Sequence, residues 1–280
     1  MIVDFHTHIF PQAVVRDRER FFETEPDFAL LYRDSGSKLA DIEDLIDSMD
    51  ESGIDLSVVC GFPWKSPELF RRHNDCITEA VVKYPKRIKG FGSFDVENAL
   101  VEKETERCLR NGLSGIGELA FYRSGIDAER RKRLEPVMEI CGAGNLPVLI
   151  HTNETIGDKY PGKSPVTLKQ IYDLALAFPD NKIVLAHWGG GIFFYCLMKR
   201  TVKRALANVY YDTAASPYLY DPQVYRTAID LAGIDKILFS SDYPLLSPNR
   251  YFAELRSAGL DPSQIDAICG ENAIKILNPA

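Results

Sequence analysis

The segment Ile2-Val3-Asp4-Phe5-His6-Thr7-His8 is an apolar run that ends in two histidines. Its pattern predicts a β-strand, in which residues i and i+2 point to the same face. His6 and His8 therefore project together from the end of that strand. Imidazole is a frequent metal ligand near neutral pH, because its neutral form carries a free nitrogen lone pair. The segment predicts a strand that brings a pair of metal ligands to one point.

Short apolar runs of the same kind recur along the chain and alternate with longer amphipathic segments, such as residues 39–49. The predicted strands are Ile2–Phe5, Leu56–Cys60, Ile88–Phe94, Gly115–Leu119, Val148–Ile150, Ile183–Ala186, Val209–Asp212 and Ile237–Ser240. Strands that alternate with helices predict βαβ units and a parallel sheet. Evenly spaced units of this number predict a closed (β/α)8 barrel of the TIM type, and an open doubly wound sheet is the alternative.

The composition shows no break along the chain, so we expect a single domain over residues 1–280. The connection after the first strand, residues 11–38, is long and contains short helical patterns of its own. Long connections of this kind tend to be functional. We expect residues 11–38 to form a lid over the mouth of the barrel.

Composition and charge exclude several classes of function. The chain is 45% hydrophobic and has a formal net charge of -7, with 40 acidic and 33 basic residues. This balance disfavours a nucleic-acid partner, and apolar runs such as 146–150 are too short to span a membrane. The N-terminal residues do not resemble a secretion signal, and the six cysteines are scattered, as is typical of reduced thiols. We expect a cytoplasmic protein that acts on a small-molecule substrate.

Polar residues also stand at the ends of other predicted strands. Glu118 ends the fourth strand, and His151 and His187 follow the fifth and sixth. Asp242 follows the eighth. Because the carboxyl ends of the strands meet at one face of such a barrel, these side chains match a catalytic divalent-metal site with an open position. The remaining histidine, His73, lies in a charged helical pattern and is interpreted as an ordinary surface or helix residue.

The chain resembles the metal-dependent amidohydrolase superfamily in the ordered set His6-x-His8, His151, His187 and Asp242. Two segments, His187-Trp188-Gly189-Gly190-Gly191 and Ser241-Asp242-Tyr243-Pro244, are similar to its amidohydrolase-related branch, which also contains non-oxidative decarboxylases. The resemblance implies a homodimer and a first metal held by His6, His8, His151 and Asp242. It also implies that His187 lies at or beside a second metal, where it orients water or substrate.

Glu118 bears on the number of metals. By the same resemblance, a glutamate on the fourth strand can bridge two metals in hydrolytic members, whereas decarboxylase-like members usually use one metal and lack this bridge. Alternatively, Glu118 forms a hydrogen bond within the barrel or handles a proton. We expect one or two divalent ions, with Zn first and Mn, Fe or Co as alternatives, because histidine and carboxylate suit all of them.

Our leading hypothesis is a metal-dependent hydrolase of the amidohydrolase type. A metal-bound water would attack a small ester, lactone or amide, or a phosphoryl group, while His187 stabilises the oxyanion and Asp242 moves the proton. The first alternative is a single-metal non-oxidative decarboxylase of an aromatic or unsaturated carboxylic acid. Weaker alternatives are a non-catalytic metal-binding barrel and a nuclease, which the acidic balance disfavours.

The loops after the strands supply the expected substrate-binding residues, which are Trp64, Tyr122, Arg123 and Trp188. Aromatic side chains offer flat apolar walls, and Arg123 could hold a substrate carboxylate in bidentate fashion. Alternatively, Arg123 belongs with the basic cluster 130–133 on a solvated helix. Asn153, Lys159 and Lys163, on the loop after the fifth strand, could also reach the substrate.

Overall fold

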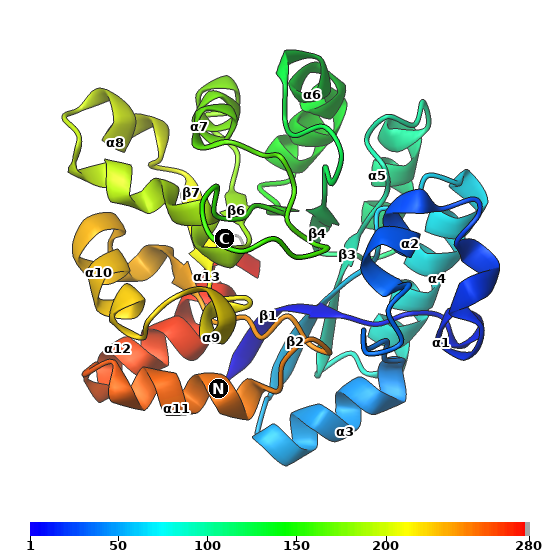
Figure 1. The fold of residues 1–280 in the computed structure, drawn as a ribbon, viewed down its shortest axis with the longest axis horizontal. Helices are drawn as coiled ribbons and strands as arrows, with labels where there is room; N and C mark the ends of the chain where they lie inside the picture. Colours follow the sequence, from blue (N-terminus) through cyan, green and yellow to red (C-terminus); the bar gives the residue numbers. More distant parts are fainter. Residues whose placement is uncertain (278–280) are drawn as a thin grey trace.

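A computed structural model describes residues 1–277, and within them eight parallel strands follow one another around a barrel in chain order (Figure 1). The strands are β1 (Val3–His8), β2 (Leu56–Cys60), β3 (Ile88–Gly92), β4 (Gly115–Leu119), β5 (Val148–Ile150), β6 (Ile183–Leu185), β7 (Val209–Asp212) and β8 (Ile237–Leu238). The first and last strands meet where Phe5 N donates a hydrogen bond to Phe239 O (2.9 Å) and Asp242 N donates one to His6 O (2.9 Å). The predicted TIM-type barrel is confirmed.

The strand bounds differ from the predicted ones mainly at the carboxyl ends. Strand β1 continues through both histidines to His8, and β3 and β8 end two residues earlier than predicted. After β8 the chain leaves the extended conformation, because Asp242 has a left-handed backbone with φ of 59°. The side chain of Asp242 is therefore carried by backbone that lies beyond the paired residues of β8.

Apolar side chains fill the barrel on both faces of the sheet. The interior cluster includes Phe5, Phe91 and Leu149, all fully buried, and Ala273 of the last helix packs against it. A second and larger cluster lies between the strands and the surrounding helices. Burial on both faces is characteristic of a parallel sheet covered by helices, which explains why its strands are nearly continuous apolar runs.

Helices surround the barrel and connect successive strands (Figure 1). The longer ones are α3 (Ile42–Ser52), α4 (Pro67–Lys83), α5 (Val101–Arg110), α6 (Ala128–Ala143), α7 (Leu168–Ala177), α10 (Gln223–Ala232) and α11 (Pro248–Ser257). The shorter ones are α8 (Thr201–Ala205), α9 (Ser216–Leu219), α12 (Pro262–Asp266), α13 (Asn272–Leu277), η2 (His187–Leu197), η3 (Ile234–Lys236) and η4 (Ala267–Glu271). Helix α3 is preceded by Asp41, whose side chain accepts from the backbone N–H of Asp44, and is followed by Gly53 in a left-handed conformation.

The predicted insertion folds into α1 (Gln12–Arg16), η1 (Arg18–Phe21) and α2 (Pro26–Tyr32). It is fastened to the barrel by Glu25, whose buried carboxylate accepts hydrogen bonds from the backbone N–H groups of Lys65 (2.9 Å) and Ser66 (3.0 Å). These donors lie at the N-terminus of α4, where negative charge is stabilised. The insertion is thus anchored beside the barrel mouth, and its role as a movable lid stays a prediction.

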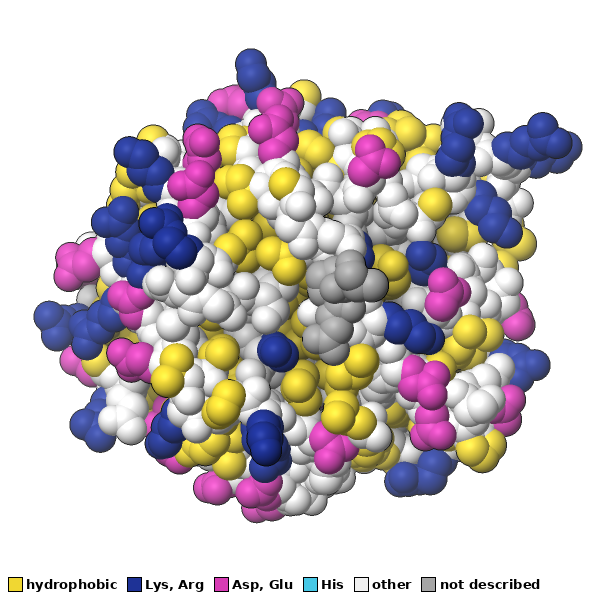
Figure 2. All heavy atoms as spheres, turned by 180° about the vertical axis from the view of Figure 1, so that it is seen from behind, with side chains coloured by type: hydrophobic (Ala, Val, Ile, Leu, Met, Phe, Trp, Pro, Cys, Tyr) yellow, Lys and Arg dark blue, Asp and Glu magenta, His cyan; other side chains and the backbone are white. Residues whose placement is uncertain are grey.

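The face opposite the view of Figure 1 carries basic and acidic side chains interspersed with one another (Figure 2). Among residues 1–277, no helix combines the length and the apolar character needed to cross a membrane. The expected homodimer and the expected cytoplasmic location stay predictions.

Candidate metal centre

Strand β1 places His6 and His8 side by side, as the alternation of a strand requires. Their Nε2 atoms are 3.0 Å apart, and the two ring centroids are 4.9 Å apart. His6 is fully buried, whereas His8 is partly exposed at the cavity. Two imidazole nitrogens at this distance need a proton or a cation between them, because two facing lone pairs repel each other.

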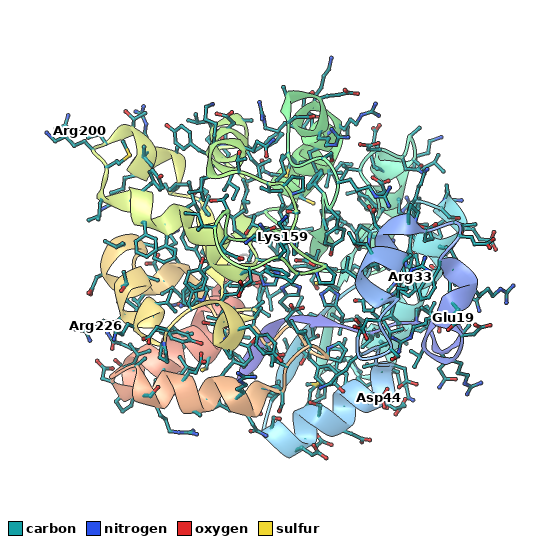
Figure 3. All side chains as sticks on the ribbon, in the orientation of Figure 1. Glu19, Arg33, Asp44, Lys159, Arg200 and Arg226 are labelled. Atoms are coloured by element: carbon teal, nitrogen blue, oxygen red, sulfur yellow. The ribbon has the colours of Figure 1, made fainter. Side chains whose placement is uncertain are left out.

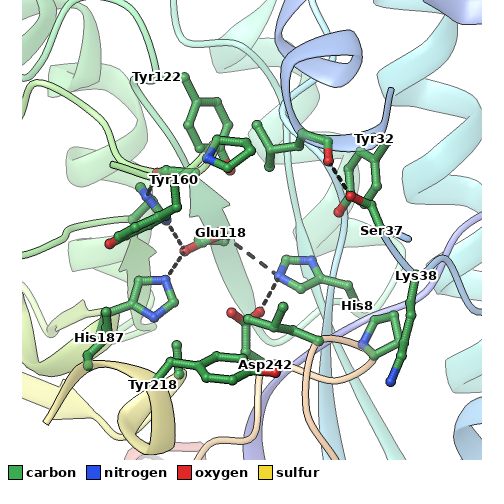
Figure 4. Close-up of a pocket in the computed structure, with 18 of the residues that line it drawn as sticks. His8, Tyr32, Ser37, Lys38, Glu118, Tyr122, Tyr160, His187, Tyr218 and Asp242 are labelled. Atoms are coloured by element: carbon green, nitrogen blue, oxygen red, sulfur yellow. Dashed lines mark hydrogen bonds and ion pairs between the residues drawn. The ribbon is translucent and has the colours of Figure 1, made fainter. Parts of the chain in front are cut away.

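Glu118, at the end of β4, lies between two groups of imidazoles (Figure 4). Its Oε2 is 3.7 Å from His6 Nε2 and 3.8 Å from His8 Nε2. Its Oε1 is 2.9 Å from His151 Nδ1 and 3.8 Å from His187 Nε2. Among the described residues, the two groups that can hold a metal ion are His6, His8 and Glu118, and Glu118, His151 and His187. Glu118 belongs to both groups and offers one oxygen to each.

Asp242 completes the site from the opposite side of the barrel. Its Oδ1 is 3.4 Å from His8 Nε2 and 3.9 Å from His6 Nε2. The preceding residue, Ser241, is held by Asp4, whose buried carboxylate accepts hydrogen bonds from Ser241 N and Oγ. Burial alone would raise the pKa of Asp242, but its contact with His8 and the nearby His6 lower this pKa to about 2. Asp242 is therefore ionised and available as a ligand at neutral pH.

In two histidines, the ring nitrogen that points away from Glu118 is hydrogen-bonded to a backbone carbonyl. His187 Nδ1 lies 3.0 Å from Ala214 O, and His151 Nε2 lies 2.9 Å from Gly162 O. A carbonyl oxygen can only accept, so both of these ring nitrogens carry the proton. His151 Nδ1, 2.9 Å from Glu118 Oε1, donates a second proton to that carboxylate, and a metal ion at this position would replace the proton and leave a neutral ring with its lone pair towards the ion. A histidine that binds a metal needs this tautomer. The residues present therefore suit a divalent metal ion.

Asp212, at the end of β7, holds the site from behind and was missed in the sequence. It is fully buried, and its Oδ2 accepts a hydrogen bond from His6 Nδ1 (2.9 Å). Its Oδ1 accepts hydrogen bonds from the backbone N–H groups of His187 (2.8 Å) and Ala214 (3.0 Å). A carboxylate behind a ligating histidine fixes its tautomer and orientation. Because Asp212 ends a predicted strand, the same rule that located Glu118 also predicts its position at the carboxyl end of the barrel.

Burial and charge act against each other at Glu118. Burial disfavours its ionised form, but the positive charges of His151 and His6 hold the pKa of Glu118 well below its ordinary value. Glu118 is therefore a carboxylate whose negative charge balances the surrounding imidazoles.

The backbone after β6 turns sharply through glycines to position His187. Residues His187 and Trp188 have φ of 55° and 61°, and Gly189, Gly190 and Gly191 also lie in the left-handed region. A Cβ on Gly190 would overlap the carbonyl of Asn153. Only glycine lets this turn approach the loop after β5 so closely, which explains the glycine run that follows His187.

A cavity of about 820 Å³ opens above these residues. Its floor is formed by His8, Glu118, His151, His187 and Asp242. Aromatic side chains on its walls are Tyr32, Phe62, Tyr122, Tyr160 and Tyr218 (Figure 4). Among the described residues that line it, Lys38 is the one with a basic side chain other than histidine. The predicted metal residues thus converge on one cavity, with His6 buried just beneath its floor.

Of the predicted substrate-binding residues, Tyr122 lines the cavity and lies nearly parallel to Phe62, at an interplanar angle of 12°. Arg123 lies outside the lining, and its side chain is 59% exposed and paired with Asp27 of the insertion. Arg123 therefore joins the insertion to the β4 loop instead of facing the cavity.

The two tryptophans are buried away from the cavity. Trp188 Nε1 donates to Ser216 Oγ (3.0 Å), and Trp64 Nε1 donates to His73 Nδ1 (2.8 Å). The prediction of a surface position for His73 is wrong, although it does lie on α4: it is 1% exposed and its Nε2 donates to Ile9 O (2.6 Å). Burial lowers the pKa of His73 to about 4. The charged and polar residues on either side of His73 in the sequence hid a buried side chain that joins α4 to the segments after β1 and β2.

Comparison with known proteins gives relatives over the whole chain. The chain is 24% identical to γ-resorcylate decarboxylase of Polaromonas sp. (strain JS666) over 263 residues, which cover 74% of this chain and 78% of the relative. It is 22% identical to 2-amino-3-carboxymuconate-6-semialdehyde decarboxylase of Dictyostelium discoideum, over 98% of this chain and 91% of the relative. A 5-carboxyvanillate decarboxylase structure from Novosphingobium aromaticivorans, solved with manganese, superposes with a TM-score of 0.78 at 16% identity, covering 99% of this chain and 96% of that one.

These relatives correct one expectation. The prediction of a hydrolase is wrong, because the curated relatives that match the chain are decarboxylases. The family model described as Amidohydrolase matches residues 3–278. This match runs from the first strand to the last helix, so the chain belongs to the amidohydrolase family, in the branch that also contains non-oxidative decarboxylases.

Proposed function

We propose that this protein is a metal-dependent non-oxidative decarboxylase of an aromatic or unsaturated carboxylic acid. The observation that carries the proposal is the convergence of histidines, Glu118 and Asp242 on the floor of one aromatic-walled cavity, in a chain whose curated relatives are decarboxylases. Non-catalytic metal binding is less well supported, because the cavity is large enough for a substrate beside the metal site.

We assign the metal ligands to His6, His8, His151 and Asp242, with Glu118 between the two groups of histidines. A divalent metal bound there would supply Lewis-acid polarisation of substrate oxygens. Manganese is the first choice, since two similar structures were solved with it, and Zn suits the same ligands. One ion bound by the four assigned ligands leaves His187 free for proton transfer, whereas a second ion held by Glu118, His151 and His187 would engage it.

The walls favour a flat substrate. Phe62 and Tyr122 lie nearly parallel, and the Tyr122 ring is 5.1 Å from the ring of His151. Tyr32 reaches the cavity from the insertion. An aromatic or conjugated acid would pack against these rings, and the ammonium of Lys38 and the metal site would attract its negative charge.

The reaction needs a proton at the substrate carbon. The bond between the carboxyl carbon and the substrate carbon breaks, CO2 leaves, and the electron pair remains on the substrate carbon, which takes up a proton. We assign proton delivery to the imidazolium form of His187, in which Nδ1–H is held by Ala214 O and Nε2–H faces the cavity. Asp242, ionised at neutral pH, suits the role of a metal ligand.

The test is CO2 release from carboxyl-labelled substrates by manganese-loaded protein. The first panel contains 2,6-dihydroxybenzoate, 5-carboxyvanillate and 2-amino-3-carboxymuconate 6-semialdehyde, which are substrates named for the similar proteins. We expect release from at least one of them, lost in a H187Q variant and in chelator-treated protein. Folded, metal-loaded protein that releases CO2 from none of them would overturn the proposal.

The number of ions is measured separately, as metal content per chain of the wild type and of E118Q. One ion in both proteins is the expected result, because a single ion leaves His187 free, and Glu118 then serves in a hydrogen bond or a proton transfer. Two ions in the wild type and one in E118Q would make Glu118 a bridge and remove His187 from proton delivery.

A further inference from the structure

The loop between β5 and α7, residues 151–167, has no helix or strand of its own and crosses the mouth of the barrel (Figure 1). Its residue Lys159 lies over the centre of the molecule in the view of Figure 3. Several of its residues, including Glu154, Tyr160 and Gly162, line the cavity. A loop this long without regular structure needs internal contacts to hold one shape.

Lys163 supplies these contacts. Its ammonium donates hydrogen bonds to Glu154 Oε1 (2.8 Å), Ile156 O (2.9 Å) and Asp158 O (3.0 Å). The other carboxylate oxygen of Glu154 accepts from Tyr160 Oη (2.9 Å), and the ammonium lies 5.6 Å from the centre of the Tyr160 ring. An ammonium has three N–H donors, so these bonds use all of them. Lys163 is therefore committed to the loop instead of to a substrate.

The residues on either side of Lys163 are fastened to the end of β5. Gly162 O accepts the hydrogen bond from His151 Nε2 (2.9 Å). Ser164 N donates to Asn153 Oδ1 (2.8 Å), and Asn153 Nδ2 donates to Ser164 O (3.2 Å). The loop shape that Lys163 fixes is thus the shape that brings a carbonyl oxygen to the outer nitrogen of His151.

We propose that Lys163 is a positioning residue of the metal centre. It holds the loop so that Gly162 O keeps the proton of His151 on Nε2 and leaves Nδ1 facing Glu118, 2.9 Å away. Without this carbonyl the ring can turn over or exchange its tautomer, and both changes remove the lone pair from the metal site. The inference rests on the proposed role of His151 as a ligand, but not on the reaction that the protein catalyses.

The experiment compares the wild type with K163M and with K159M, which removes the same charge from an exposed position on the same loop. Imidazole ¹⁵N–¹H spectra of zinc-loaded, ¹⁵N-histidine-labelled protein report which ring nitrogen carries the proton, and the chain has only five histidines to assign. An H151Q variant identifies the His151 signals. A manganese titration measures metal affinity on the same proteins.

We expect a His151 Nε2–H signal in the wild type and in K159M. In K163M this signal should be lost or averaged, and metal affinity should fall by about 10–100-fold. E154Q, which weakens the same contact while leaving the lysine in place, should shift both measurements in the same direction and serves if K163M does not fold.

Two results would overturn the inference. One is a wild-type spectrum with the His151 proton on Nδ1. The other is a folded K163M or E154Q protein with an unchanged His151 signal and unchanged metal affinity. Failure of CO2 release in a wild type that shows the expected spectrum and affinity would count against the proposed reaction alone.

Discussion

The floor and the walls of the cavity are built in different ways. The floor consists of side chains at strand ends, such as His8 and Glu118, and is braced from behind by the buried carboxylate of Asp212. The walls include the insertion and the loop 151–167, whose shape depends on side-chain contacts such as those of Lys163. A floor fixed by the sheet suits chemistry that needs exact ligand positions, whereas loop walls can change with the substrate without disturbing it.

The largest contrast between floor and wall is expected for two aspartates of the same cavity. D242N removes an ionised side chain from the floor and should lower kcat/KM for CO2 release by about 10²–10⁴-fold. D158N changes an exposed side chain of the wall and should leave kcat/KM nearly unchanged. Near-normal turnover in D242N would remove Asp242 from the catalytic machinery.

A second contrast separates supporting residues from lining residues. Trp64 is 1% exposed and packs beneath the insertion, so W64A should lower the free energy of unfolding by about 3–5 kcal/mol. Tyr218 lines the cavity and is 60% exposed, so Y218A should change this free energy by less than about 0.5 kcal/mol and should raise KM. Denaturant unfolding and steady-state kinetics on both variants measure the difference. A W64A protein of normal stability and raised KM would place Trp64 at the substrate after all.

The brace behind the floor is tested by D212N. An amide offers one acceptor oxygen in place of two, so it must turn an NH2 group either towards His6 Nδ1–H or towards the backbone N–H groups of His187 and Ala214. Manganese affinity should fall by about 10–100-fold, as a titration would show, with D158N again as the control. Unchanged affinity would mean that the sheet alone orients His6.

The smallest expected effect is a pH dependence of stability beneath the insertion. The pKa of His73 is lowered to about 4 in the folded protein, below the ordinary value of about 6.5 in the unfolded chain. The unfolded state therefore binds a proton first as pH falls, and stability is lost between about pH 6.5 and pH 4. Between pH 7 and pH 5, the free energy of unfolding should fall by roughly 1–2 kcal/mol more in the wild type than in H73Q. Parallel curves for the two proteins would show that His73 does not contribute to this loss.

The differences between prediction and structure follow the division between the floor and the walls of the cavity. His6, His8, Glu118, His151 and Asp242 were found from the sequence because each follows an apolar strand, and parallel strands carry their ends to one face. Asp212 follows the same rule and was overlooked. The reaction was predicted wrongly, because the same ligand set serves hydrolysis and decarboxylation and only comparison with relatives separates them.

Trp64, Trp188 and Arg123 follow strands in the chain as closely as Tyr122 does, yet only Tyr122 lines the cavity. Once a chain leaves a strand, the direction of each side chain depends on partners far away in the sequence, such as His73 for Trp64 and Asp27 for Arg123. The sequence by itself determined the barrel, the insertion and the floor of the site. The periodicity of each strand is a local property, and every βα unit repeats the same arrangement with its carboxyl end at one face. Only the tertiary structure decided which side chains form the walls and which carboxylates and carbonyls fix the histidine tautomers, because these depend on long-range hydrogen bonds and packing.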